Sequence, residues 1–355
     1  MDPRTADLTT DRTTVALWEG GDAVRLVEVP LPDLGPGEVL VRVRLTTVCG
    51  SDRHTVSGRR PAPVPSVLGH EAVGDVVAVG PGGVDAEDGG PLRTGDRVVW
   101  GVTVSCGTCD RCAAGRTAKC RAVRKVGHEA FASAWPLSGT YARHLVLPAG
   151  STVARVPAAV PDDLASPAGC ATATVMATIE AAGPLAGRRV LVSGAGMLGI
   201  TAVAAARAAG AAQVLVTDPD AARRDLALRF GATSALGVDE PVGGGDVAIE
   251  LSGSSPAVAR CLDALDVGGR LVLAGSVTPS PAVPLDPERV VRRWLTVTGV
   301  HNYEPRHLRA ALDLLERTRE TVPWSDLVTP AVGLDQVGRL LSGPAGPAPR
   351  AAVVP

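Results

Sequence analysis

Three glycines at fixed spacing after an apolar run limit most narrowly how this chain can fold. In "VLVSGAGMLG", Gly194, Gly196 and Gly199 follow a short apolar segment and open an alanine-rich one. A tight strand-to-helix turn needs the first glycine, close approach of a pyrophosphate needs the second, and close packing of helix on strand needs the third. The spacing therefore predicts a dinucleotide site at the start of a helix, with Met197 and Leu198 in the same cofactor-binding turn.

An acidic residue closes the next apolar run, as a dinucleotide site of this kind requires. Asp218 ends "AQVLVTD", the expected place for a carboxylate that binds the adenosine ribose. Because that carboxylate repels a 2′-phosphate, Asp218 favours NAD over NADP. Arg223 and Arg224 weaken this preference, since either could pair with such a phosphate, although both also fit a solvated helix face. An incidental glycine-rich turn is the alternative interpretation, and the order of strand, turn, helix and acid argues against it.

The hydrophobic pattern divides the 355 residues into parts of different style. Up to about residue 160, short apolar runs such as "VLVRVRLTTV" and "GDVVAVG" are bounded by Gly, Pro and Asp, which predicts a β-rich barrel or sandwich body. Residues 161–302 alternate apolar runs with alanine-rich amphipathic segments, which predicts a parallel sheet with helices on both faces. Residues 303–355 carry a further helix and a final strand, "RAAVVP". We therefore expect an α/β protein of about two domains.

Composition limits the classes of function. Hydrophobic residues make up 45% of the chain and charged residues 20%, which is enough apolar material for sizeable cores. The formal net charge is −2 and no long basic run occurs, which argues against nucleic acid as a partner. The start "MDPRTADLTTDRTT" lacks the apolar centre of a secretory signal, and the longest apolar stretch, 190–206, indicates strand, turn and helix rather than a membrane span. We expect a cytoplasmic protein with no membrane partner.

Four of the seven cysteines are clustered in "CGTCDRCAAGRTAKC", as Cys106, Cys109, Cys112 and Cys120. Four soft thiolates at this spacing suit a closed tetrahedral zinc site, which would hold a loop in place and do no chemistry. An iron–sulfur cluster uses the same ligands and stays open as an alternative. The odd total of cysteines argues against a disulfide framework in a reducing compartment.

A catalytic metal needs an open position and ligands from separate segments. Cys49 in "VCGSD" and His70 in "VLGHEAVG" stand beside apolar strand-like runs, and Cys170 in "SPAGCATA" lies at the junction of the two halves. Two cysteines and a histidine with water in the fourth position are a known catalytic zinc set. Each could instead be a core residue, since a lone cysteine more often packs than binds metal. Because Gly-His-Glu recurs in "KVGHEAFA", local sequence does not distinguish His70 from His128.

Taken together, these stretches resemble the zinc-dependent medium-chain dehydrogenase/reductase family, whose members include alcohol dehydrogenases. The resemblance covers nearly the whole chain and rests on "CGSD", "LGHEAVGDVVAVG", "GDRVV", the four-cysteine lobe, the cysteine at the junction and "GAGMLG" with its acid, in this order. Within the family, "PAGCATATVMATIEAAG" and "GVHNYEPRHLRAAL" look most like a bacterial subgroup that includes dehydrogenases associated with phosphonate catabolism.

The resemblance implies a particular domain plan. Residues 1–160 would form a GroES-like catalytic domain with a structural-zinc lobe, 161–302 a Rossmann NAD-binding domain, and 303–355 a return to the catalytic domain. It also implies two zinc ions per chain, NAD as cofactor, and a homodimer or homotetramer.

The resemblance also assigns roles to individual residues. Catalytic zinc would lie on Cys49, His70 and Cys170, and structural zinc on Cys106, Cys109, Cys112 and Cys120. Glu71 would be a carboxylate that can approach the catalytic zinc, and Asp52 would orient His70. Ser51 and His54 would pass the substrate proton to solvent through the cofactor ribose. Thr174 would lie beside the nicotinamide, Arg223 near the adenosine ribose, and Arg350 on the pyrophosphate.

These roles describe an alcohol dehydrogenase that reversibly oxidises a small alcohol to a ketone or aldehyde, with zinc as Lewis acid. A reductase of an imine or activated alkene, or a redox-neutral enzyme acting on a cyclitol, is the alternative within the family. A non-enzymatic dinucleotide-binding protein is a third, although a retired site need not keep its ligands and relay residues. His128 is not a ligand in the family pattern, and we interpret it as an ordinary loop residue rather than one lining the substrate cleft; Cys261 is assigned to packing.

Overall fold

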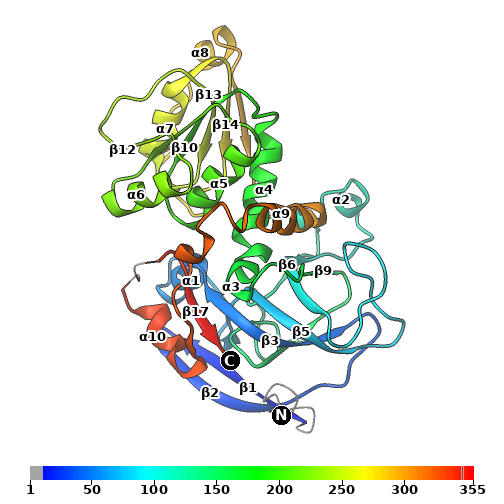
Figure 1. The fold of residues 1–355 in the computed structure, drawn as a ribbon. Coiled ribbons are helices and arrows are strands. Elements are labelled where there is room, and N and C mark those ends of the chain that lie inside the picture. The colour runs from blue at the N-terminus through cyan, green and yellow to red at the C-terminus, as the bar shows by residue number, and fades with distance from the viewer. Residues whose placement is uncertain (1–10, 345, 347) are drawn as a thin grey trace. The chain divides into compact units, whose positions relative to one another are not determined.

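The computed structural model describes residues 11–344, 346 and 348–355. The chain divides into two compact units (Figure 1). The first comprises the residues up to Gly169 together with those from Val328 onward, and the second is Cys170–Leu327. The predicted fold class is confirmed, since a β-rich unit is joined to a unit that alternates strands and helices.

Two sheets form the framework of the first unit. In the described residues, one sheet runs in the order β16-β17-β3-β5-β6-β7, with β8 paired to β3 and β9 to β6, and the other in the order β2-β1-β4. The bounds are β1 (Arg12–Gly20), β2 (Ala23–Pro30), β3 (Val39–Val48), β4 (Ser66–Val67), β5 (Glu71–Val79), β6 (Arg97–Val104), β7 (Arg124–Lys125), β8 (His144–Leu147), β9 (Ser151–Arg155), β16 (Val332–Gly333) and β17 (Ala351–Val354).

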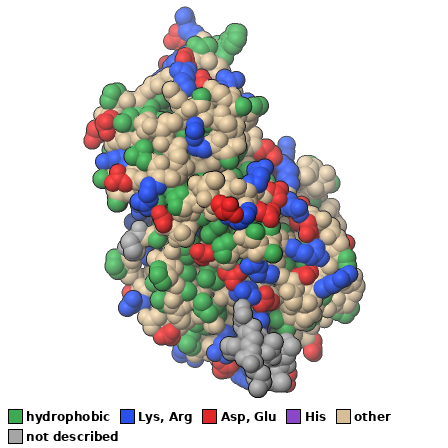
Figure 2. Space-filling model, viewed as in Figure 1, with side chains coloured by type: hydrophobic (Ala, Val, Ile, Leu, Met, Phe, Trp, Pro, Cys, Tyr) green, Lys and Arg blue, Asp and Glu red, His purple; other side chains and the backbone are tan. Residues whose placement is uncertain are grey.

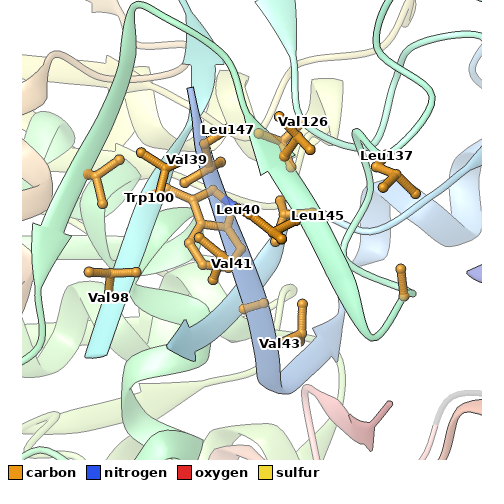
Figure 3. Close-up of a cluster of buried hydrophobic side chains, with 14 of the residues drawn as sticks. Val39, Leu40, Val41, Val43, Val98, Trp100, Val126, Leu137, Leu145 and Leu147 are labelled. Carbon is orange, nitrogen blue, oxygen red and sulfur yellow. The ribbon is translucent and has the colours of Figure 1, made fainter. Parts of the chain in front are cut away.

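Small aliphatic side chains fill the core of this unit (Figure 3). Val41 of β3, Leu145 of β8 and Val98 of β6 are fully buried, and they pack with Trp100 in one cluster. Each such aliphatic side chain contributes about 1.5–3 kcal/mol of burial free energy. Pairing of β3 with both β5 and β17 gives the end of β3 a fixed position, and the candidate site begins there.

Short helices connect these strands. They are α1 (Gly50–Val56), α2 (Asp110–Ala113), α3 (Asp162–Ala165) and α10 (Val337–Ser342), with the 3-10 turns η2 (Thr117–Lys119), η3 (Ser166–Gly169) and η5 (Leu334–Gln336). Helix α10 packs against β2 and α1, and η3 packs against β3, β5 and β6.

The second unit is built on a parallel sheet of order β12-β11-β10-β13-β14-β15. The strand order reverses beside β10, which is the arrangement of the dinucleotide-binding Rossmann fold. Its strands are β10 (Arg189–Ser193), β11 (Gln213–Thr217), β12 (Ser234–Leu236), β13 (Gly245–Glu250), β14 (Leu265–Leu273) and β15 (Thr296–Gly299). Its helices are α4 (Ala171–Ala182), α5 (Met197–Ala208), α6 (Ala221–Arg229), α7 (Ser255–Ala264), α8 (Pro287–Arg292), α9 (Pro305–Thr318) and the 3-10 turn η4 (Trp324–Leu327).

The chain passes from one unit to the other at positions that differ from the predicted boundaries, 160/161 and 302/303. The first boundary follows Gly169, because η3 packs on β5 of the first unit. The second follows Leu327, because α9 is amphipathic and packs against α4 and α5. Its buried leucines, among them Leu308 and Leu312, therefore belong to the core of the second unit. Helical period alone did not show which sheet this helix would cover.

The apolar stretch at 190–206 forms β10, a turn and α5, as predicted. Within the described part of the chain, no helix has both the length and the apolar character that crossing a bilayer requires. Acidic and basic side chains are interspersed on the face shown in Figure 2.

Candidate active site and metal centres

The glycine turn of the second unit has the geometry that its sequence predicts. Gly194 has φ +96°, and a Cβ on Gly199 would lie 1.8 Å from the carbonyl oxygen of Gly194. Any side chain at these positions is therefore strained or excluded. A Cβ on Gly196, the residue that caps α5, would meet no heavy atom within 4 Å, so the backbone is open where a pyrophosphate would approach.

A pocket of about 610 Å³ lies beside this turn and is lined by residues that include Gly194, Gly196, Asp218, Arg223, Ser252 and Arg260. Met197 and Leu198 lie in the first turn of α5 outside this lining, and Met197 is buried. Thr174, half-buried on α4, is also outside it.

The Asp218 carboxylate lies at the end of β11 and is buried. Its Oδ2 accepts a hydrogen bond from the backbone of Ala195 at 2.7 Å, and Oδ1 accepts one from the backbone of Asp220 at 2.9 Å. Arg224 donates to the carbonyl oxygens of Asp218 and Pro219. Arg224 is thus engaged with backbone, and the pocket wall carries the acids Asp218 and Asp239 and the bases Arg223 and Arg260.

Glu250, which was not predicted from sequence, supports this site from the neighbouring strand β13. It is fully buried at the end of β13, and its Oε1 accepts hydrogen bonds from the backbone of Ser252 at 2.6 Å and of Gly253 at 2.8 Å. A Cβ on Gly194 would lie 2.9 Å from the same Ser252 nitrogen, so Glu250 fixes the loop that faces the glycine turn. An acid followed by Leu-Ser-Gly at the end of the apolar run "DVAIELSG" was the available signal.

The four clustered cysteines bring their sulfur atoms together, and all four Sγ atoms lie within 4.8 Å of one another. The distance is 3.5 Å for Cys109–Cys112, 3.9 Å for Cys109–Cys120 and 3.4 Å for Cys106–Cys120. Four sulfurs held about 2.3 Å from one tetrahedral ion would lie about 3.8 Å apart. The donor set therefore fits a single four-coordinate ion, whereas a cluster would interpose iron and sulfide and separate the thiolates further.

Hydrogen bonds around these sulfurs also favour thiolates. The backbone of Cys106 and of Ala122 donates to Sγ of Cys120, each at 3.3 Å. Hydrogen bonds from Thr108 and the backbone of Cys109 lower the pKa of Cys106 to about 6, whereas desolvation and neighbouring thiols raise the pKa of Cys112 to about 12. Because unlike pKa values in one cluster mean that one sulfur holds a proton for another, a cation is needed to ionise all four.

We expect Cys112→Ser to lose one metal ion per chain and to lower the thermal midpoint by several degrees, because a structural metal closes the lobe that carries it. Calorimetry and elemental analysis measure both quantities. Cys261→Ala is the matched control, since Cys261 is buried on α7 outside both metal-ligating groups. The control should keep the full metal content. Iron in place of zinc, or unchanged metal content in Cys112→Ser, would contradict the assignment.

A second group of donors lies in the first unit and at its chain boundary. Cys49, His70, Glu71 and Cys170 each place one donor atom within 4.8 Å of the others. Cys49 follows β3 and caps α1, His70 immediately precedes β5, and Cys170 follows η3 directly in the chain. In the antiparallel pairing of β3 and β5, Thr47 lies opposite Glu71, so the end of one strand meets the start of the other. Ligands far apart in sequence are thereby held on strand ends.

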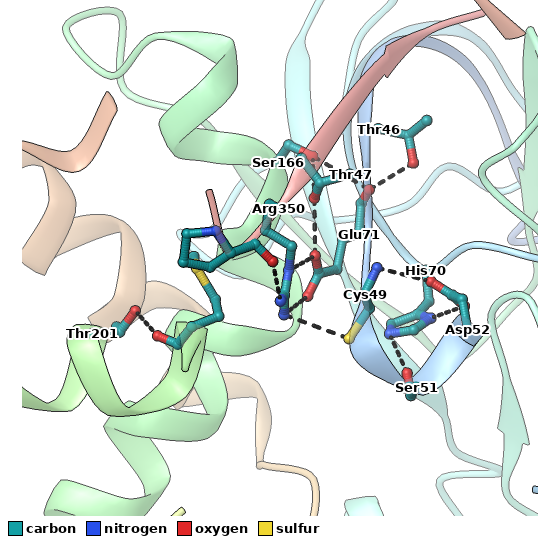
Figure 4. Close-up of polar contacts among 12 residues, drawn as sticks. Thr46, Thr47, Cys49, Ser51, Asp52, His70, Glu71, Ser166, Thr201 and Arg350 are labelled. Carbon is teal, nitrogen blue, oxygen red and sulfur yellow. Dashed lines mark hydrogen bonds and ion pairs between the residues drawn. The ribbon is translucent and has the colours of Figure 1, made fainter. Parts of the chain in front are cut away.

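Asp52 organises the His70 side of this group (Figure 4). Its Oδ1 lies 3.2 Å from Nδ1 of His70, at ion-pair distance but not aligned as a hydrogen bond. Its Oδ2 accepts hydrogen bonds from the backbone of Cys49 at 3.0 Å and from the hydroxyl of Tyr141 at 2.8 Å. Nε2 of His70 faces Oγ of Ser51 at 3.3 Å, so it is the ring nitrogen available to a metal. Tyr141 was not identified from sequence, because "SGTYARH" carries no motif that indicates it.

The electrostatics of these residues favour a cation. Burial lowers the pKa of His70, yet the negative charge of Asp52 and the Cys49 thiol outweigh burial and raise it well above the ordinary value. A histidine that is buried and nevertheless attracts a proton lies in an excess of negative potential. Two thiols and a histidine with such a potential fit a bound zinc ion, which would replace that proton.

Arg350 forms an ion pair with the carboxylate of Glu71, a contact that the resemblance did not imply. The carboxylate is fully buried, and Arg350 donates from Nε to Oε2 at 2.6 Å and from Nη2 to Oε1 at 2.9 Å. Nη2 also lies 3.5 Å from Sγ of Cys49, and Thr47 donates to Oε2 at 2.9 Å (Figure 4). Burial raises the pKa of Glu71, and the charge of Arg350 opposes that rise. Arg350 is therefore a partner of Glu71, and the pyrophosphate contact that the resemblance implied stays a prediction.

The two remaining histidines of interest also lie in the first unit. His54 follows Ser51 by three residues on α1, so both can share one helix face. The ring of His128 lies beside that of His70, with centroids 5.5 Å apart, although His128 is not in the donor group. Burial, together with the charges of His70 and Arg60, lowers the pKa of His128 to about 3, so it is neutral near pH 7. Cys261 is buried on α7, as a packing residue would be.

Two family models match the chain. Residues 35–158 match the alcohol dehydrogenase GroES-like domain, and residues 198–317 match the zinc-binding dehydrogenase model. The L-threonine 3-dehydrogenase of Edwardsiella ictaluri is 35% identical over 301 residues, which cover 80% of this chain and 82% of that protein. The enzyme of the same name from Serratia proteamaculans is 33% identical over the same shares.

The solved structures similar to this chain include further dehydrogenases. An alcohol dehydrogenase of Thermotoga maritima has a TM-score of 0.90 at 27% identity and covers 97% of this chain and 99% of its own. A zinc-binding dehydrogenase of Sinorhizobium meliloti, solved with NADP, has a TM-score of 0.86 at 27% identity and covers 98% of this chain and 100% of its own.

Proposed function

Because the chain belongs to the zinc-dependent medium-chain dehydrogenase/reductase family, we propose that it is an alcohol dehydrogenase that uses zinc and NAD to interconvert an alcohol and its ketone or aldehyde. The observation that carries the proposal is the group formed by Cys49, His70 and Cys170, whose donor atoms lie within 4.8 Å of one another and of Glu71. Three protein ligands leave the open position that substrate needs, and a closed structural site has none.

In this proposal, Cys49, His70 and Cys170 would hold the catalytic zinc, and the four-cysteine lobe would hold a structural one. Bound zinc supplies Lewis-acid polarisation of the substrate oxygen, and bound NAD supplies a hydride acceptor. Asp52 keeps Nδ1 of His70 turned away from the substrate side, because Oδ1 lies 3.2 Å from that nitrogen. Arg350 restrains the Glu71 carboxylate and balances its charge.

Ser51 is the residue that we assign to the substrate proton. Its hydroxyl lies 3.3 Å from Nε2 of His70, the nitrogen available to a metal, and would therefore lie within reach of the substrate hydroxyl. His54 would pass the proton onward to solvent, since it follows by three residues on the same short helix.

The proton relay gives a graded prediction. Ser51→Ala should lower turnover by about 10²- to 10⁴-fold, because general acid–base catalysis contributes that much. His54→Gln should have a smaller effect and change the pH dependence, since water can partly replace the last member of a relay. Steady-state kinetics between pH 5 and 10 measure both. Unchanged kinetics in the two variants would remove the relay.

Asp218 supports NAD as the preferred cofactor. Its buried carboxylate lines the pocket beside the glycine turn and would face the ribose 2′ position. The Sinorhizobium relative was solved with NADP, so membership of the family does not by itself select NAD, and we assign the choice to this wall. Arg223 lines the same pocket, with Nε 3.9 Å from a carboxylate oxygen of Asp220.

We expect Asp218→Ser to shift cofactor use towards NADP by at least about tenfold in relative kcat/KM. The change removes both the repulsion of a 2′-phosphate and the hydrogen bonds to a 2′-hydroxyl. Asp225→Ser on α6, outside the pocket lining, is the control and should keep the parent ratio. A parent enzyme that already prefers NADP would contradict our assignment of Asp218.

A panel of primary, secondary and cyclic alcohols with NAD and with NADP tests the activity itself. Equal amounts of reduced nicotinamide and carbonyl product support a dehydrogenase. Turnover of an activated alkene or imine without alcohol oxidation would favour the reductase alternative.

We further propose that the protein is a homodimer or homotetramer that acts in the cytoplasm. We also propose that it belongs with the bacterial phosphonate-associated subgroup of the family.

A further inference from the structure

The two Gly-His-Glu copies lie against each other in the first unit. A Cβ on Gly127 would lie 2.2 Å from the carbonyl oxygen of Gly69, and both glycines have positive φ, +71° and +91°. Only glycine permits this approach of backbone to backbone. The contact accounts for the glycine of the second copy, and the rings of His70 and His128 lie 5.5 Å apart, inclined by 48°.

The hydrogen bond of His128 fixes which nitrogen remains available. Nδ1 lies 2.7 Å from the carbonyl oxygen of Val126. Because a carbonyl oxygen only accepts, Nδ1 carries the hydrogen, and Nε2 of the neutral ring is an acceptor. Nε2 has no hydrogen-bond partner among the described residues. It is also absent from the fully buried polar atoms that lack a partner there, so Nε2 is accessible to solvent or to a ligand.

Arg60 and Lys125 bring positive charge near this ring, and Asp52 is the negative charge that acts on it. Lys125 is half-buried, and burial followed by the charges of Arg60 and Lys119 lowers its pKa. The charge of Arg60 also acts on His128. Within the described part of the chain, neither Arg60 nor Lys125 has an ion-pair partner, and the Glu129 carboxylate accepts from the backbone of Lys125. Positive charge beside an acceptor disfavours an ammonium donor and permits a neutral hydroxyl.

We propose that Nε2 of His128 accepts a hydrogen bond from a second hydroxyl of the substrate, on the carbon next to the reacting one, so that the enzyme prefers vicinal diols. The inference rests on the proposed dehydrogenase activity and on the position of His128 beside a ligand of the catalytic site. A monoalcohol bound there would leave the Nε2 acceptor without a hydrogen-bond partner. An acceptor left unpaired in the complex costs more free energy than one hydrogen bond contributes net. The resulting discrimination is about 10- to 100-fold in kcat/KM.

The test compares matched substrates on the zinc-loaded enzyme. Each of several secondary monoalcohols is paired with its vicinal diol and with the corresponding amino alcohol, for example 2-butanol, 2,3-butanediol and 3-amino-2-butanol. The parent enzyme should favour the diol over the monoalcohol by about 10- to 100-fold and over the amino alcohol as well. The loss in the monoalcohol should appear mainly in KM, since the bond forms equally in bound substrate and transition state.

Two variants separate the hydrogen bond from packing. His128→Phe keeps an aromatic ring without an acceptor and should bring the diol-to-monoalcohol ratio close to one. His128→Gln returns an acceptor oxygen and should restore part of the preference. Zinc content is measured in each, so that altered metal binding is not mistaken for altered recognition. If the His128→Phe protein does not fold, His128→Leu tests the same loss of the acceptor nitrogen.

The outcomes are distinct. Turnover without a diol preference, or a preference that His128→Phe leaves intact, overturns this inference alone. A preference for the amino alcohol overturns the hydroxyl assignment. Absence of alcohol oxidation across the whole panel overturns the proposed function and this inference with it.

Discussion

His70→Ala should lose one of two zinc ions per chain and lower kcat/KM by about a thousandfold or more, because Lewis-acid catalysis contributes several kcal/mol. His70 is 3% exposed, lies beside Asp52 and shares its donor group with two cysteines. Removal of one of three protein ligands weakens zinc binding, and loss of zinc leaves the substrate oxygen unpolarised. The four-cysteine lobe is a separate group and should keep its ion.

The other histidine of the repeated tripeptide is the control for the metal count. His128→Ala changes a ring that lies 5.5 Å from that of His70 but is outside the donor group. We expect two zinc ions per chain in this variant, measured by elemental analysis after one common purification. Loss of zinc from His128→Ala, with both ions retained in His70→Ala, would reverse the assignment.

Arg350→Leu should lower the free energy of unfolding by about 3–5 kcal/mol, the cost of leaving a buried charge without its partner. Arg350 is 5% exposed and Glu71 is fully buried, so water cannot replace the guanidinium. The carboxylate would have to stay charged in an apolar environment or take up a proton. Chemical denaturation of the metal-loaded protein, followed by a structural probe, measures the change.

Two comparisons identify the source of that loss. The double variant Arg350→Leu with Glu71→Gln should recover part of it, since the unpaired charge is gone. Arg25→Ala removes a surface pair with Glu19, in which both side chains are well exposed, and should cost no more than about 1 kcal/mol. Equal losses in Arg350→Leu and Arg25→Ala would show that the buried pair contributes nothing special.

The dinucleotide half could be predicted from local sequence because its signal is local. Strand, turn and helix follow one another in "VLVSGAGMLG", and the predicted tasks of Gly194 and Gly199 correspond to a positive φ and a close backbone contact. Glu250 escaped prediction, because its role depends on the loop after β13 folding back to its own strand end.

The metal half needed the resemblance, since its donors come from separate segments. Spacing alone identified the four-cysteine lobe but left open which residues would join Cys49. Pairing of β3 with β5 brings the two segments together, and no local pattern encodes that register. The partners Tyr141 and Arg350 come from still further along the chain, so neither was assigned to Asp52 or Glu71. The contact of Gly127 with Gly69 was likewise invisible in the repeated tripeptide.

The most direct test of the account follows nicotinamide reduction by the purified enzyme as its zinc is removed and returned. With an alcohol that the panel identifies and with NAD, we predict one reduced nicotinamide for each carbonyl formed. Activity should disappear when a chelator removes the ion held by Cys49, His70 and Cys170, and it should recover when zinc is added back. Full activity in protein shown to lack that zinc, or no net nicotinamide reduction with any alcohol, would contradict the account.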